Sequence, residues 1–120
     1  MALDAKGRRA FVLCNGNHVL TVFDLDAYRS IASIPIPTGA DVVKFDSGLN
    51  RIYAACASGA IVVIQEDDPQ HFRKLEDFPV EPKVHSLAVD VNTHRVYAPE
   101  QEERSRPVSR MIVYEAISRP

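Results

Sequence analysis

The hydrophobic positions of this chain fall into short runs separated by polar turns. Val, Ile, Phe and Ala dominate the segments 41–46, 51–56 and 60–65. Ser-Gly pairs and an Asp-Asp-Pro cluster lie between these runs, and such residues favour turns between strands. No stretch of adequate length has the 3.6-residue period of a helix. The pattern therefore predicts a β-protein, with a more polar fourth strand over residues 72–78 completing this group.

One motif recurs three times along the chain. It reads apolar residue, Asp, four residues, Arg, apolar residue, aromatic residue, and its aspartates are 42 and 44 residues apart. Its members are Asp4, Arg9 and Phe11, then Asp46, Arg51 and Tyr53, then Asp90, Arg95 and Tyr97. Apolar runs ending at Asp24, Gln65 and Glu115 keep step with it. Four strands in a period of this size are typical of one β-propeller blade.

The repeat predicts an all-β fold made of β-propeller blades, each a four-stranded antiparallel sheet, in an incomplete ring. Blade boundaries are expected near residues 1–40, 41–83 and 84–120. Within each motif, the aspartate at the strand end is expected to accept hydrogen bonds from turn N–H groups. The arginine begins the next strand, and we expect it to reach that aspartate across the turn. These nine motif residues are therefore assigned a structural role.

The motif resembles the YVTN-repeat, YncE-like seven-bladed β-propellers of prokaryotes. The matching pieces are residues 89–97, 45–55 and 60–64, and the resemblance extends over nearly the whole chain. The absence of Trp disfavours the WD40 type. The resemblance implies architecture more than activity, because relatives include lactonases, quinoprotein-like and haem-domain proteins and plain interaction modules. It also implies a secreted or periplasmic protein, although no signal peptide is visible at the N-terminus.

About two and a half blades leave two sheet faces without neighbours. Each face is about 300 Å² at ordinary strand spacings, the size at which an apolar patch usually marks an interface. We therefore expect a homo-oligomer that continues the ring, or the remainder of a propeller, as the partner.

Composition and charge exclude other partners. The formal net charge is -2, which gives no electrostatic basis for binding nucleic acid. No apolar run approaches the roughly 18 residues of a membrane span. No metal or phosphate-binding motif occurs, so no metal and no cofactor is predicted.

Asp41 and His85 are the candidate ligand-binding residues. They occupy equivalent places at the start of the first strand of successive blades, which lines the central channel of a propeller. A His beside a carboxylate can bind a metal or a polar ligand. The alternative is that both cap strand ends and face channel water.

Other polar features are expected to be structural. Cys14 and Cys56 are predicted to be unbridged buried thiols, because facing sheets lie farther apart than a disulfide spans. The acidic stretch 65–71 is expected to be a solvated turn, and residues 100–107 an exposed hairpin. The favoured function is a non-catalytic module that acts as a ligand-binding or protein-interaction scaffold. The alternative is a fragment of a propeller lactonase, hydrolase or quinoprotein-like oxidoreductase whose active site lies mostly outside this chain.

Overall fold

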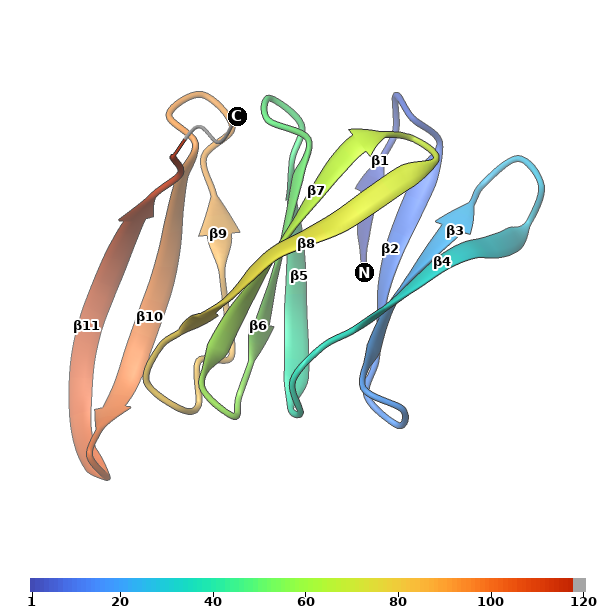
Figure 1. Cartoon of the computed structure of the whole chain (residues 1–120). Helices are drawn as coiled ribbons and strands as arrows, with labels where there is room; N and C mark the ends of the chain where they lie inside the picture. The colour runs from blue at the N-terminus through green and yellow to red at the C-terminus, as the bar shows by residue number, and fades with distance from the viewer. Residues whose placement is uncertain (118–120) are drawn as a thin grey trace.

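The computed structural model describes residues 1–117, and all regular structure within them is β-strand. The strands form three antiparallel sheets that follow one another along the chain (Figure 1). The first sheet contains β1 (Ala2–Asp4), β2 (Arg9–Cys14), β3 (Val19–Asp24) and β4 (Arg29–Pro35). The second sheet contains β5 (Ala40–Asp46), β6 (Arg51–Cys56), β7 (Ala60–Asp68) and β8 (His71–Pro79). The third sheet contains β9 (Ala88–Val89), β10 (Arg95–Glu103) and β11 (Arg106–Glu115).

The aspartate of each motif ends the first strand of its sheet and holds the turn that follows. Asp46 Oδ1 accepts hydrogen bonds from the backbone N–H groups of Gly48 and Leu49, at 2.8 and 3.4 Å. Asp4 and Asp90 make equivalent contacts with their own turns. The residue before each motif arginine has a positive φ, between 54° and 62°. These residues are Arg8, Asn50 and His94. A short polar turn of this kind returns the chain directly into the neighbouring antiparallel strand.

The three sheets pack face to face, and each contact has its own apolar core. Every second residue of a strand points to the same face, so register partners form rows across a sheet. In the first sheet, Phe11, Leu13, Leu20 and Val22 face the second sheet. At the equivalent places in the second sheet, Tyr53, Ala55, Ile61 and Val63 face the third sheet. The repeated motif thus repeats a packing surface as well as a turn.

The second sheet differs from the expected pattern at one end. β6 spans the expected residues, but β7 continues to Asp68 and β8 begins at His71. The prediction of a solvated turn over residues 65–71 is therefore wrong for its first half. Glu66 lies in β7 and is only 4% exposed. The alternation of the strand carries its side chain inward despite its charge.

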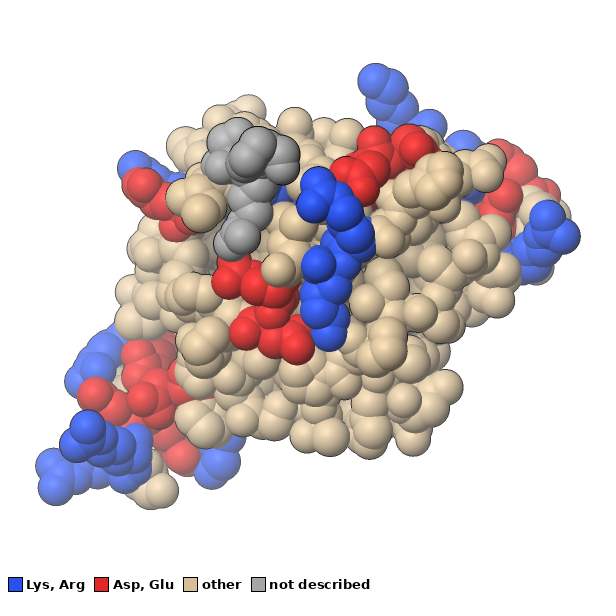
Figure 2. Space-filling view, in the orientation of Figure 1, with Lys and Arg blue, Asp and Glu red and all other residues tan. Residues whose placement is uncertain are grey.

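The third sheet is distinguished by a long hairpin. β10 and β11 extend well beyond β9 and turn at Arg104 and Ser105, both with positive φ. Arg110 pairs with Glu103 at 2.6 Å near the hairpin tip. Figure 2 shows basic and acidic side chains interspersed there, at the lower left, instead of a patch of one sign. Among the described residues, no helix is long and apolar enough to cross a membrane.

Candidate functional site

The motif arginines contact a different partner from the one expected. Each lies opposite a polar residue in the third strand of its own sheet: Asp24 and Glu115 end their strands, whereas Gln65 lies within β7. Arg51 Nε donates to Gln65 Oε1 at 2.9 Å. Arg9 and Arg95 lie 3.5 Å from carboxylate oxygens of the equivalent residues, Asp24 and Glu115. The expected contact with the turn aspartate is not among the interactions of these arginines, although cross-strand register places Asp4 opposite Arg9 and Asp46 opposite Arg51. The aspartate carboxylates instead accept hydrogen bonds from the N–H groups of their own turns.

Two of these arginines also join neighbouring sheets. Arg9 Nε donates to the backbone carbonyl of Pro69, in the turn that follows β7 of the second sheet. Arg51 Nη1 donates at 2.8 Å to the backbone carbonyl of Ile117, which follows β11 of the third sheet. Both guanidinium groups are buried. Each arginine therefore connects its own sheet to the backbone that directly follows the third strand of the next sheet.

A second polar contact crosses from the second sheet to the third. His94 Nδ1 lies 2.7 Å from Asp46 Oδ2, and the Asp46 side chain is fully buried. Gly48 lies directly beneath the imidazole, where a Cβ atom would be 2.5 Å from His94 Cε1. Asp46 therefore stabilises its own turn and also contacts the third sheet through His94.

Asp41 and His85 lie together in the structure. Asp41 is in β5, and His85 lies in the segment before β9, outside any strand. His85 Nδ1 and Asp41 Oδ2 are 2.5 Å apart, and each side chain is a little under half exposed. A carboxylate on one ring nitrogen of a histidine orients the other nitrogen toward a ligand. Within residues 1–117, however, no group of three or more His, Cys, Asp or Glu is placed to hold a metal ion.

Both cysteines are free thiols. Cys56 is fully buried, and burial raises the pKa of its thiol to about 11. Cys14 is only partly buried, so the expectation of a buried thiol is wrong for this residue, and its Sγ contacts the Thr21 hydroxyl at 3.6 Å. Neither thiol forms a nucleophile–base pair with a histidine in the described part of the chain.

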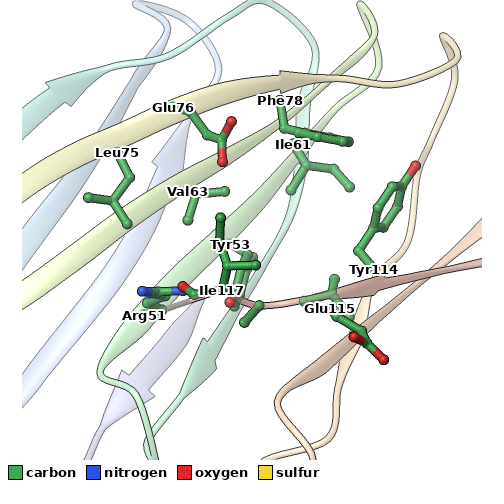
Figure 3. A pocket seen from close by; sticks show the side chains of 12 residues that line it. Arg51, Tyr53, Ile61, Val63, Leu75, Glu76, Phe78, Tyr114, Glu115 and Ile117 are labelled. Atoms are coloured by element: carbon green, nitrogen blue, oxygen red, sulfur yellow. The ribbon is translucent and has the colours of Figure 1, made fainter. Parts of the chain in front are cut away.

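A cleft opens between the second and third sheets, away from Asp41 and His85. Its volume is about 280 Å³. Most of its lining is apolar and comes from both sheets, as Figure 3 shows. The principal apolar residues are Ile61, Val63, Leu75, Phe78, Val96 and Tyr114. Because the lining side chains belong to sheet rows, the walls of the cleft are preformed.

Polar atoms reach this cleft at a few defined places. Tyr53 is 4% exposed, and its buried hydroxyl makes no well-aligned hydrogen bond, although the Arg51 side chain lies close to it. Burial raises the pKa of the Tyr53 hydroxyl more than the charge and the hydrogen-bonding proximity of Arg51 lower it. Arg51, Glu76 and Glu115 also line the cleft. The hydroxyl therefore stays protonated at neutral pH and can both donate and accept a hydrogen bond.

An aromatic pair closes one side of the cleft. The rings of Phe78 and Tyr114 are 5.2 Å apart and inclined at 75°, an edge-to-face contact between β8 and β11. Burial also raises the pKa of the Tyr114 hydroxyl, and the charge of Glu100 adds to that rise. The contact joins the outer strands of the two sheets, and Figure 3 places both rings together beside Ile61.

Sequence reasoning assigned Tyr53 a structural role and did not identify the cleft. The signal for Tyr53 was present: it is the motif aromatic, and Phe stands at the equivalent place in the first sheet. A hydroxyl at a position that buries a plain phenyl ring in a sister repeat needs a partner. The other cleft residues come from two sheets, from β6, β7 and β8 of the second and from β10, β11 and the residues after β11 of the third, so only the fold brings them together.

Comparison with known proteins supports the architecture. No protein-family model matches the chain, and no curated protein matches it by sequence. Among solved structures, the chain is similar to the dihydro-heme d1 dehydrogenase NirN in complex with DHE, with a TM-score of 0.75 and 18% sequence identity. The similarity covers 95% of this chain but 23% of that one, so this chain spans about a quarter of its length. At this identity the likeness shows the fold alone. The sheets are β-propeller blades, as the repeat predicts.

Proposed function

We propose that this chain is a non-catalytic β-propeller module that binds a compact, mostly apolar ligand in the cleft between the second and third blades. The observation that carries the proposal is the buried Tyr53 hydroxyl, which lies at the wall of an apolar cleft and makes no well-aligned hydrogen bond within the chain. The YncE-like resemblance agrees with a binding scaffold but does not specify the ligand.

The size of the cleft limits the ligand. Small-molecule sites usually have volumes of about 300–1,000 Å³, and a dry cavity of about 150 Å³ admits benzene. At about 280 Å³, the cleft accepts a molecule of one or two fused rings. A larger planar cofactor does not fit between these two blades.

The polarity of the cleft limits the ligand further. A buried hydroxyl without a partner costs about 1–3 kcal/mol, and a ligand with one hydrogen-bonding group removes that cost. Arg51 is already engaged with Gln65 and Ile117, so it does not offer a free charge to an anion. The best ligand is therefore neutral, with a single donor or acceptor aimed at Tyr53.

The alternative, a fragment of a propeller enzyme, draws on the Asp41–His85 pair. A hydrogen-bonded carboxylate and imidazole are part of many general-base and metal sites. Replacing His85 with Ala and finding unchanged Zn²⁺ binding and no loss of hydrolase activity on an ester panel would exclude this alternative. The cleft favours binding over catalysis, because its lining brings no nucleophile beside a base.

Indole is a suitable probe for the cleft. It has two fused rings and one N–H donor, and the chain contains no Trp, so indole fluorescence is read without interference. We expect saturable binding with a blue-shifted indole emission, as the ring leaves water. Tyr53→Phe keeps the shape of the site but removes its hydroxyl, so binding should weaken about fivefold, the value of one neutral hydrogen bond.

Two further variants separate the cleft from other apolar surface. Val63→Phe fills the cleft and should abolish saturable binding. Ile31→Phe, which introduces the same phenyl ring at a partly exposed position of β4, is the control and should leave binding unchanged. If indole binds without saturation, or if Val63→Phe binds as well as the natural chain, the cleft is not a ligand site.

A further inference from the structure

The outer face of the third blade repeats the packing surface used inside the molecule. Tyr97, Pro99, Met111 and Val113 stand where Tyr53, Ala55, Ile61 and Val63 stand in the second blade, as their register shows. Those second-blade residues form the core against the third blade. In the third blade, Met111 is 58% exposed and Val113 is 48% exposed. An apolar surface already built for blade packing is therefore open on this face.

The outer face of the first blade carries the complementary surface. Leu3, Ala10 and Phe23 form one row across β1, β2 and β3. In the second blade the equivalent row, Phe45, Ile52 and Ile64, packs on the first blade. Leu3 is 55% exposed. The outer face of the first blade is thus equivalent to the second-blade face that packs on the first blade. The outer face of the third blade is equivalent to the second-blade face that packs on the third blade.

Charged residues at the turns of the third and first blades are complementary in the same head-to-tail arrangement. Between the second and third blades, Asp46 contacts His94. The next aspartate in the series is Asp90, and the first-blade residue equivalent to His94 is Arg8, which shares its positive φ. Arg8 is more than half exposed and pairs at 3.2 Å with Asp26, which is exposed as well. A third blade placed against a first blade would therefore bring a carboxylate to a guanidinium.

The third motif arginine, Arg95, occupies the position from which Arg9 and Arg51 contact the next blade. Arg9 and Arg51 each donate to a backbone carbonyl beyond the third strand of the next blade. Arg95 is half exposed and contacts Glu115 at 3.5 Å within its own blade. In a neighbouring first blade, the equivalent carbonyls belong to the β3–β4 turn, residues 25–28.

We propose that the third blade of one chain docks on the first blade of a second copy, and that two copies close a six-bladed ring in which the third blade of each copy contributes three strands. Each contact covers two faces of about 300 Å², so one contact buries about 600 Å² and a closed pair about 1,200 Å². Specific interfaces begin near 1,200 Å², which favours the closed pair over an open chain. Propellers have 4–8 blades, and three copies would make nine.

This inference is independent of the cleft, which lies between two blades of one chain. The expected mass by light scattering across a dilution series is twice that of one chain. Within the molecule, Phe11 and Phe45 lie 5.2 Å apart. Their equivalents at the new contact are Tyr97 of one copy and Leu3 of the other, so these two positions define the test.

Tyr97→Glu and Leu3→Lys, made singly, each place an unpaired charge in the contact and should weaken dimerisation about a hundredfold. The double variant should restore the dimer, because each contact of a head-to-tail ring sets the introduced lysine against the introduced glutamate. A contact between like faces would set like charges together and would not be restored. Gln70→Glu, in the β7–β8 turn of the middle blade, is the charge control and should not change the mass.

Far-UV circular dichroism verifies that each variant is folded, and indole binding verifies the cleft separately. A dimer lost in both single variants and regained in the double variant supports the ring. A natural chain that stays monomeric over the whole series overturns the inference. Growth beyond two copies, or a double variant that stays monomeric, overturns it equally.

Discussion

Glu66 makes the stability of this chain depend on pH, and the structure determines both the sign and the size of the effect. β7 carries the residue toward Asp4 of the first blade, where it is 4% exposed. Burial raises the pKa of the Glu66 carboxyl group from 4.5 to about 8. The hydrogen bond with Asp4 and the charge of Asp4 add to the rise, and the charge of Arg9 opposes it.

Between pH 4.5 and about 8, Glu66 keeps its proton in the native state but has released it in the unfolded state. The free energy of unfolding therefore falls as the pH rises. The contribution of protonated Glu66 is fully present below pH 4.5 and is lost as the pH passes through about 8. Each pH unit in this window costs about 1.4 kcal/mol, so the loss between pH 4.5 and 7.5 reaches about 4 kcal/mol. That is a large part of the stability of a small domain.

Glu66→Gln keeps the size of the side chain and removes its ionisation. Urea unfolding, followed by far-UV circular dichroism at one protein concentration, measures both chains across this range. The variant should gain about 4 kcal/mol over the natural chain between pH 4.5 and 7.5. Glu115→Gln makes the same change at an exposed position and is the control. Parallel pH curves for Glu66→Gln and the natural chain would refute the reasoning.

Two other consequences are simpler to measure. Gly48→Ala places a methyl group against His94 and Asp46, so it should lower the free energy of unfolding by about 1–3 kcal/mol; an unchanged melting temperature would contradict the packing described between the second and third blades. Iodoacetamide should modify Cys14 well before Cys56 at pH 8, because Cys56 is fully buried and the pKa of its thiol is raised to about 11; equal labelling rates by mass spectrometry would show that the core opens freely.

The repeated motif shows how far local pattern reaches. Its aspartate predicts a hydrogen-bonded turn, and the structure confirms it, because that contact depends only on residues a few places away in the chain. The predicted partner of its arginine was wrong, because the aspartate carboxylate bonds to its own turn while Arg9 and Arg51 reach backbone carbonyls of the next sheet. Glu66 was missed for a similar reason: its charge indicated a turn, while the continuation of β7 placed it inside.

The sequence alone determined the all-β architecture, the repeat and the approximate strand positions, since these follow from alternation, turn residues and a fixed period. It also placed Asp41 and His85 at equivalent points of successive blades, and the structure brings the two into contact. Only the tertiary structure decided the cleft, the buried Tyr53 hydroxyl and the matching outer faces of the first and third blades. These features depend on residues of different blades. The distances between those residues and the burial of their side chains follow from how the blades pack, so the sequence of a single repeat does not predict them.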